Sequence, residues 1–223
     1  MKQMIKDTIV LFVITILAGA MLGGVYFITK KPIAEQEALA KARAYQTVFA
    51  DADRFEDEAD FDSAHADLVL SNIDKEHDYS GSTVKMFSLA YSKDELLGFV
   101  VTMTSHEGFG GDISFSMGIR LDGTLNGISI TEIKETAGLG MKAPEILVPQ
   151  FSDKATDARF VVVKTGAVYA SDIDAISGAT ITSKAITNAV NAGITYELYR
   201  LEQYMNGQAL LSAGDQNGGG LDA

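Results

Sequence analysis

The sequence predicts an α+β domain, an antiparallel sheet with packed helices, that follows a single N-terminal transmembrane helix. Three features support this prediction. An uncharged apolar segment occupies residues 8–28. Consecutive segments in which apolar and polar residues alternate, separated by short turns, run from about residue 83 to residue 135. A long segment with apolar residues at every third or fourth position follows at 182–205. The first feature is typical of a membrane span, the second of a sheet and the third of an amphipathic helix.

The apolar segment from Thr8 to Ile28 contains no charged residue. A helix needs about 20 such residues to cross a hydrocarbon core of about 30 Å. A cleaved signal peptide is the alternative, but its apolar core is usually only about 7 to 15 residues long. We therefore expect residues 1–31 to form a short cytoplasmic stub and a membrane anchor.

The orientation of this anchor is less clear from the charges. Basic residues stand on both sides of the segment, and more of them follow it than precede it. A count of positive charges would keep the following domain in the cytoplasm, although long domains often cross the membrane regardless of such counts. The charges involved are Lys2 and Lys6 before the segment and Lys30, Lys31, Lys41 and Arg43 after it.

Composition excludes several classes of chemistry. The 223 residues carry a formal net charge of -12 and include no cysteine. An acidic chain is a poor partner for nucleic acid. The lack of cysteine excludes disulfides, iron–sulfur clusters and Cys-ligated zinc. The three histidines, His65, His77 and His106, are not spaced as metal ligands, so we expect no metal site.

Residues 32–82 should form a helical and acidic connecting region. Residues 33–49 are rich in Ala, Glu and Lys and predict a helix that continues after a break at Pro32. Residues 51–62 are mostly acidic. They could bind a cation, but a dense run of like charges is more typical of a mobile, solvated surface.

The sheet is expected in the domain that spans residues 83–207. Short turns separate the alternating segments, which predicts that neighbouring strands pair antiparallel. A Gly-rich piece at 108–112 lacks the Lys and Ser/Thr of a phosphate-binding P-loop, so we interpret it as a turn between strands. The predicted strands are 83–92, 96–106, 111–123 and 126–135.

Three elements should complete the domain. Residues 144–151 predict a short helix, and residues 158–166 a further strand. The last helix, 182–205, should pack one apolar face on the sheet. A flexible tail is expected at 208–223 because the chain becomes polar and Gly-rich there. The apolar face of the helix consists of Ile186, Val190, Ile194, Leu198, Leu201 and Met205.

The segment DAISGATITSK, residues 174–184, joins the predicted strand and the last helix. Its hydroxyl groups permit two interpretations. Thr180, Thr182 or Ser183 could accept a hydrogen bond from an early helical N–H and thus cap the helix. Alternatively, the free N–H groups and the positive end of the helix dipole could bind a phosphate, which a Thr hydroxyl could contact or esterify.

Residues 174–180 resemble the D-x-x-S/T-G-A-T flavinylation motif of FMN-binding domains. In that family the side-chain oxygen of the last Thr is joined to the phosphate of FMN. The resemblance therefore implies covalent FMN on Thr180. It also implies that the rest of the motif surrounds the cofactor, namely Asp174, Ser177, Gly178 and Ala179.

Residues 135–140 resemble the E-T-P-G-L-G loop of the same family, with Ala137 in place of Pro. The resemblance implies that this loop lies against the flavin, and Leu139 with Met141 would supply an apolar wall. No catalytic acid or base is expected, since a flavin needs only to be oriented and tuned. The implied contact residues are Glu135, Thr136, Gly138, Leu139 and Gly140.

Both motifs, the anchor and the intervening strands together resemble the G subunits of Rnf electron-transport complexes and, less closely, the C subunits of sodium-pumping NADH:quinone reductases. This resemblance implies a membrane-anchored flavoprotein that relays electrons in a ferredoxin:NAD oxidoreductase coupled to ion translocation. It implies other Rnf subunits, integral membrane ones included, and a flavin transferase as partners. It also implies that the C-terminal domain lies outside the cytoplasm.

Two other hypotheses remain open from the residues. A free-standing extracytoplasmic flavin reductase domain would keep the cofactor but pass electrons to small acceptors. A non-enzymatic anchored binding module would use the SGAT corner, residues 177–180, only as a helix cap.

Overall fold

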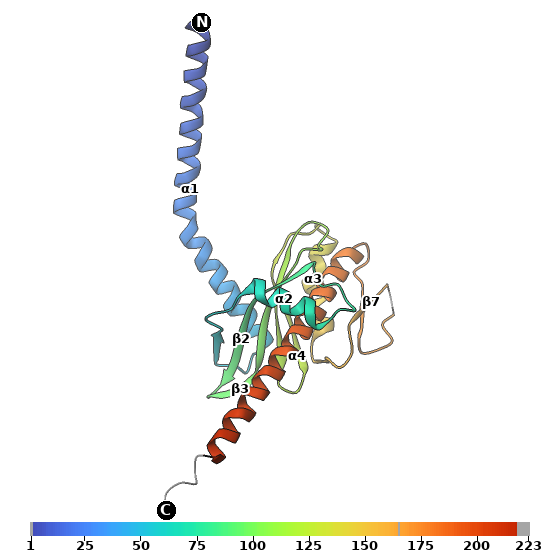
Figure 1. The fold of residues 1–223 in the computed structure, drawn as a ribbon. Coiled ribbons are helices and arrows are strands. Elements are labelled where there is room, and N and C mark those ends of the chain that lie inside the picture. Colours follow the sequence, from blue (N-terminus) through green and yellow to red (C-terminus); the bar gives the residue numbers. More distant parts are fainter. Residues whose placement is uncertain (1, 165, 218–223) are drawn as a thin grey trace, which may run out of the picture. The chain divides into compact units, whose positions relative to one another are not determined.

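The computed structural model describes residues 2–164 and 166–217. The chain divides into two compact units, Met1–Ala42 and Arg43–Ala223. The described residues of the first unit, 2–42, lie within helix α1, Lys2–Val48 (Figure 1). Its most apolar window has a mean hydropathy of 2.4, and α1 is long and apolar enough to cross a membrane. In the described parts of the chain it is the one helix that meets this test.

Helix α1 continues through Pro32. The expected break at this residue is therefore wrong. A proline inside a helix removes one backbone donor and costs roughly 3 kcal/mol. The Ala- and Glu-rich sequence that follows has a high helix propensity, which explains why the helix continues without interruption.

The second unit is built on a six-stranded sheet in the order β1-β2-β3-β4-β5-β6. Every neighbouring pair is antiparallel, as predicted. The β2–β3 hairpin turns on Lys93 and Asp94, both with positive φ, which is the type I′ geometry that suits the twist of paired strands. The strands are β1 (Arg54–Asp57), β2 (Ser82–Ser92), β3 (Glu95–Ser105), β4 (Ile113–Arg120), β5 (Thr124–Ile133) and β6 (Lys154–Ala155).

The acidic stretch at 51–62 contains regular structure, although most of its acidic side chains are exposed, as expected for a solvated surface. Strand β1 lies inside this stretch and pairs with β2. Asp62 caps the next helix, α2 (Ser63–Ile73), by accepting a hydrogen bond from Ala64 N at 2.9 Å. Glu58 receives a bidentate contact from Arg200, at 2.8 and 3.0 Å. The acidic side chains thus contact separate partners while most of them stay exposed to solvent.

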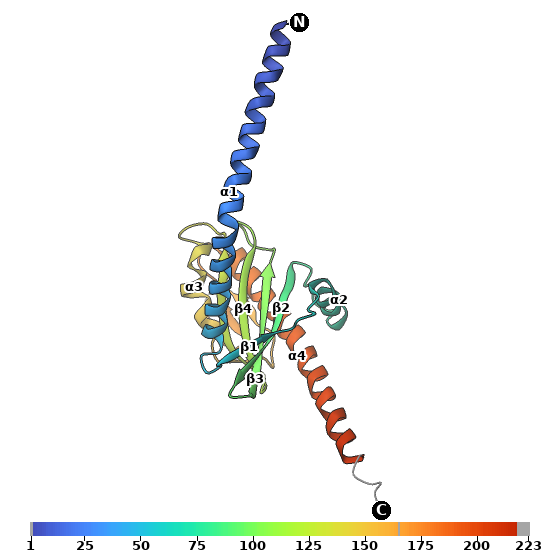
Figure 2. The same ribbon diagram turned by 90° about the vertical axis from the view of Figure 1, so that its left-hand side faces the viewer.

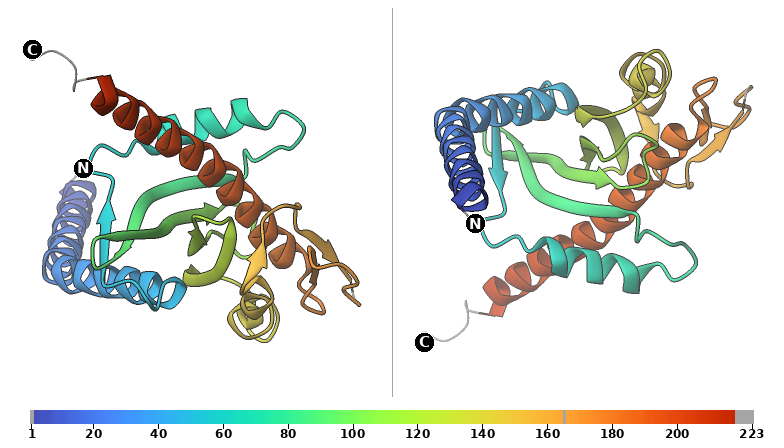
Figure 3. Two further views of the ribbon diagram at one scale, coloured as in Figure 1. Left: turned by 90° about the horizontal axis from the view of Figure 1, so that it is seen from below. Right: turned by 90° about the horizontal axis from the view of Figure 1, so that it is seen from above.

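Two apolar clusters cover the two faces of the sheet. Helix α4 (Thr180–Asn217) crosses one face over β2, β3 and β4, and α2 packs beside it (Figures 1 and 3). The last turns of α1, residues 43–48, lie on the other face with Phe49 (Figure 2). A Cβ at either Gly98 or Gly118 would come within 2.9 Å of the Phe49 ring, so these two glycines leave the room that the ring occupies.

The long last helix is confirmed, with different limits and a partly different face. It begins at Thr180, two residues earlier than predicted, and continues to Asn217. Ile186, Val190 and Ile194 are buried as expected. Leu198 and Met205 are exposed, because the side of the helix that faces the apolar cluster carries Tyr196, Glu197, Leu201 and Tyr204 instead. Of the expected flexible tail, residues 208–217 lie in this helix and residues 218–223 lie outside the described residues.

Shorter elements connect the sheet to α4. The predicted helix at 144–151 is two separate turns, because Pro149 starts a new one. The predicted strand at 158–166 is shorter and pairs parallel with β8 in a separate small sheet. This pairing directs the chain to the start of α4. The elements are η1 (Gly140–Lys142), α3 (Ala143–Ile146), η2 (Val148–Phe151), β7 (Val161–Val163) and β8 (Asp172–Asp174).

Candidate functional site

A tight corner joins β8 to the start of α4. Gly178 adopts a φ of 77°, a left-handed conformation that favours glycine. Ala179 N donates to Ile176 O at 2.9 Å, which closes the turn. Thr180, the first helical residue, therefore follows directly on a fixed turn.

The hydroxyl groups of this corner do not cap α4. Ala179 precedes the helix and has no side-chain acceptor. Ser183 Oγ accepts from Ile176 N and donates to Ala179 O, both at 3.0 Å, so it ties the turn to the helix. Among the described residues, no side chain accepts a hydrogen bond from the N–H groups of residues 180–182. These are the N–H groups that a helix start leaves unpaired, and they lie at the positive end of the dipole.

The second loop, residues 135–140, follows β5. Thr136 O accepts from Leu139 N at 3.1 Å and from Met141 N at 3.3 Å. Gly138 has a φ of 77° with no atom near its missing side chain, so this glycine serves the turn itself. The loop folds back on itself and presents Leu139, which is partly exposed.

The two loops meet in one cleft of about 360 Å³. They approach closely because two glycines lack side chains. A Cβ at Gly178 would lie 3.1 Å from Leu139 Cδ2, and a Cβ at Gly140 would lie 2.7 Å from Thr182 Oγ1. The cleft is lined by Phe109, Glu135, Thr136, Leu139, Gly140, Gly178, Ala179, Thr180, Ile181 and Thr182.

Phe109 contributes to the cleft although no sequence pattern assigned it a role. The Gly-rich piece at 108–112 is a connection between β3 and β4, as predicted. Glu135 Oε1 accepts from Phe109 N at 2.8 Å, which fixes this turn over the second loop. The Phe109 side chain is 70% exposed and lines the cleft. The available signal in the sequence was a phenylalanine within a Gly-rich turn, where a large apolar side chain has little core to enter.

The apolar wall of the cleft also differs from expectation in one residue. Phe109, Leu139 and Ile181 line it. Met141, which was expected beside Leu139, is exposed and is not part of the lining.

Three of the predicted site residues lie beside the cleft. Gly138 shapes its loop, and Ser177 is exposed at the corner. Asp174 uses its carboxylate elsewhere, because its Oδ1 accepts from Ala167 N at 3.1 Å. The Asp174 backbone exchanges two hydrogen bonds with the Gln150 side chain, at 2.8 and 3.1 Å. Asp174 therefore braces the strand that leads into the corner.

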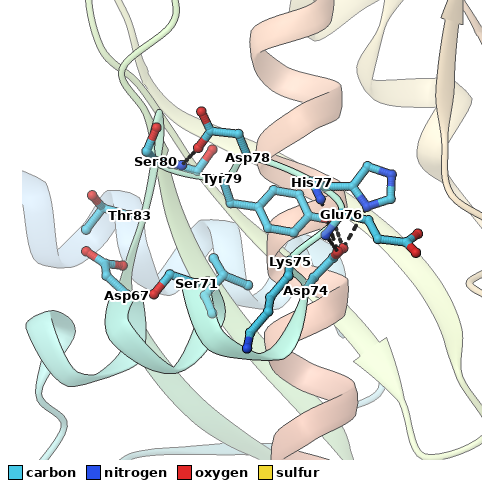
Figure 4. A pocket seen from close by; sticks show the side chains of 12 residues that line it. Asp67, Ser71, Asp74, Lys75, Glu76, His77, Asp78, Tyr79, Ser80 and Thr83 are labelled. Carbon is cyan, nitrogen blue, oxygen red and sulfur yellow. Dashed lines mark hydrogen bonds and ion pairs between the residues drawn. The ribbon is translucent and has the colours of Figure 1, made fainter.

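A larger cavity of about 510 Å³ lies between α2 and the loop before β2 (Figure 4). Its wall carries the carboxylates of Asp67, Asp74, Glu76 and Asp78. Burial raises the pKa of Asp74, but hydrogen bonds from His77, Tyr79 and two backbone N–H groups outweigh this and hold the pKa below its ordinary value. These ionised groups would repel a phosphate, so this cavity does not fit a phosphorylated ligand as the cleft at α4 does.

Comparisons with known proteins agree with a ligand site in the cleft at the start of α4. The family model described as FMN-binding domain matches residues 108–195, and the one described as RnfG N-terminal region matches residues 1–48. The G subunit of the Na⁺-translocating ferredoxin:NAD⁺ oxidoreductase complex of Acetobacterium woodii is 33% identical over 197 residues, 86% of this chain and 91% of that protein. The corresponding G subunit of the proton-translocating complex of Clostridium ljungdahlii is 27% identical over 179 residues, 80% of this chain and 83% of that protein.

A crystal structure of NqrC from Shewanella oneidensis aligns with a TM-score of 0.47 and 17% identity, covering 71% of this chain and 88% of that one.

The fold and the cleft define a class of protein: a helix able to span a membrane, followed by an FMN-binding domain whose matched range contains both loops of the site. Within that class, the long match to the A. woodii protein is specific. The chain belongs to the family of G subunits of Rnf-type ion-translocating oxidoreductase complexes.

Proposed function

We propose that the chain is the membrane-anchored electron-transfer subunit of an Rnf-type ferredoxin:NAD⁺ oxidoreductase coupled to ion translocation, and that it carries FMN joined through its phosphate to Thr180 Oγ1. The observation that supports this most directly is the position of Thr180. It opens α4 at an uncapped helix start and lines the cleft in which both loops meet.

The residues of the cleft fit the parts of FMN. Unpaired N–H groups of the first turn of α4 suit the phosphate, which keeps one negative charge after esterification. Phe109, Leu139 and Ile181 offer an apolar wall for the flavin ring. The volume of about 360 Å³ lies within the range of about 300 to 1,000 Å³ that small-molecule sites have.

The roles of the protein and of the cofactor are distinct. Bound FMN supplies the transfer of electrons, singly or in pairs. The chain itself binds the cofactor, orients it and limits the access of water to it. A covalent link to Thr180 would prevent its loss, and a flavin transferase would be needed to form that link. No residue is required as a catalytic acid or base.

The Thr180→Val variant tests the attachment. Valine has a similar volume but no hydroxyl, so the domain should fold while covalent FMN is lost. The measurement is intact mass of the denatured protein with in-gel flavin fluorescence, after co-expression with a flavin transferase. Thr187→Val, a substitution further along α4 outside the cleft, is the control and should keep the added mass. Covalent flavin in Thr180→Val would refute Thr180 as the acceptor.

We also propose that the C-terminal domain lies outside the cytoplasm and that α1 crosses the membrane once. The resemblance of the sequence motifs to those of Rnf G subunits implies this side, whereas the count of positive charges favours the cytoplasm. Protease added to intact spheroplasts should then digest the domain without lysis. A domain that is cut only after lysis would place it in the cytoplasm instead.

A further inference from the structure

Thr182 has an unusual environment for a buried polar residue. Its side chain is 1% exposed, yet it lines the cleft at the start of α4. Among the described residues its hydroxyl has no hydrogen-bond partner. The oxygen is not one of the fully buried unpaired atoms, which in the described residues are those of Thr187 and Glu197, so it is reached from the cleft that Thr182 lines.

Two other buried polar residues of α4 are hydrogen-bonded within the chain. Ser183 both accepts and donates a hydrogen bond. Asn191 does the same with the backbone of Phe160, at 2.9 Å in each direction. Thr182 differs from them because its hydroxyl faces an open cleft. A partner supplied by a bound ligand would satisfy it.

The second loop leaves space for this hydroxyl. A Cβ at Gly140 would lie only 2.7 Å from Thr182 Oγ1. Any larger residue at position 140 would therefore press on the hydroxyl and displace it. Gly140, in the second loop, and Thr182, in α4, therefore lie close together where the two parts of the cleft meet.

We propose that the Thr182 hydroxyl hydrogen-bonds the polar edge of the flavin ring, and so positions the ring and tunes its reduction potential. This inference rests on the FMN site proposed above. The depth of the residues supports it. Thr180 is half-buried next to the exposed Ser177 and Gly178, whereas Thr182 is fully buried. The charged phosphate would stay at the exposed end with Thr180, and the uncharged ring would enter the deeper end.

Two variants of the full chain, each loaded by co-expression with a flavin transferase, test this role. Thr182→Val removes the hydroxyl at similar volume, and Thr182→Ser keeps it. In loaded Thr182→Val we expect a shifted midpoint potential and a shifted flavin absorption spectrum. Loaded Thr182→Ser should resemble the unsubstituted protein. Without flavin, Thr182→Val should melt at about the same temperature as the unsubstituted protein, because the hydroxyl has no hydrogen bond to a described residue that the substitution would remove.

Thr187→Val is the matched control. Thr187 is also buried in α4 with an unpaired hydroxyl, but it lies outside the cleft. Its loss should raise the melting temperature and leave the flavin potential and spectrum unchanged. If Thr182→Val gains no FMN while Thr182→Ser does, this result would also support a contact between the Thr182 hydroxyl and the flavin.

Two results would overturn the inference. One is a loaded Thr182→Val with an unchanged potential and spectrum. The other is an equal shift in Thr187→Val, which would indicate a general effect on the helix. The proposed function fails separately, if the unsubstituted protein gains no FMN mass at all.

Discussion

Glu197 lies on the buried side of α4, fully shielded from solvent, and neither of its carboxyl oxygens has a partner among the described residues. Burial raises the pKa of Glu197 to about 8. A carboxyl group in this position is therefore mostly protonated at neutral pH, because burial away from water disfavours its ionised form.

This makes the domain sensitive to pH in a defined direction. In the unfolded chain the pKa of a glutamate is near 4.5, so between pH 4.5 and about 8 the folded state binds the extra proton. The free energy of unfolding then decreases as the pH rises through this window, and the contribution is fully present only below it. At pH 7 the loss is about 3 kcal/mol relative to pH 4.5.

Glu197→Gln should remove most of this dependence, because the amide has nearly the same shape and does not ionise. Urea unfolding at pH 5 and pH 8 would measure it, with Glu202→Gln, an exposed position on the same helix, as the control. The control should keep the dependence of the unsubstituted protein. An equal slope with pH in Glu197→Gln would show that other groups cause it.

At the scale of elements, the strands in which apolar and polar residues alternate were predictable, because alternation is a local property of the sequence. Strand β1 was not. Its residues are nearly all charged, and it forms a strand because the edge of β2 offers backbone hydrogen bonds. Glu58, the residue after β1, accepts hydrogen bonds from Arg200, a residue far along the chain. The Arg200 guanidinium also lies over the Phe87 ring, with its Cζ 4.3 Å from the ring centroid. Such pairing depends on the fold and leaves no local pattern.

In the candidate site, too, the local motifs could be predicted from the sequence and the long-range contacts could not. Two local motifs predicted that residues 135–140 and 174–180 matter, and the structure brings most of them into one cleft. Phe109 could not be assigned, because its place depends on the hydrogen bond between its N–H and Glu135, 26 positions away. Thr182 was ambiguous for a similar reason. The sequence leaves open whether its hydroxyl caps the helix, whereas in the structure the hydroxyl lies beside the space that Gly140, a residue of the other loop, leaves free.

At the scale of the whole molecule, one helix serves two units. Residues 8–28 of α1 are suited to a membrane, whereas Tyr45 and Val48 at its end belong to the apolar cluster on the sheet. Tyr45 Oη lies 2.9 Å from Ser88 Oγ, and Val48 O accepts from Asn126 Nδ2 at 2.8 Å. The boundary between the units falls after Ala42, within the helix. The apolar segment and the residues that belong to the domain are therefore parts of one continuous helix.

This arrangement predicts where the chain can be cut. A protein beginning at residue 43 should fold, because it retains the whole cluster formed by Tyr45, Val48 and Phe49. A protein beginning at residue 50 should lose several kcal/mol, since removing a buried phenylalanine side chain alone costs about 3 to 5 kcal/mol. It would also leave Asn126 without Val48 O and expose one face of the sheet. Urea unfolding and the binding of a hydrophobic dye would compare the two. Equal stability of both proteins would mean that the end of α1 covers the sheet without stabilising it, and that the domain begins at β1.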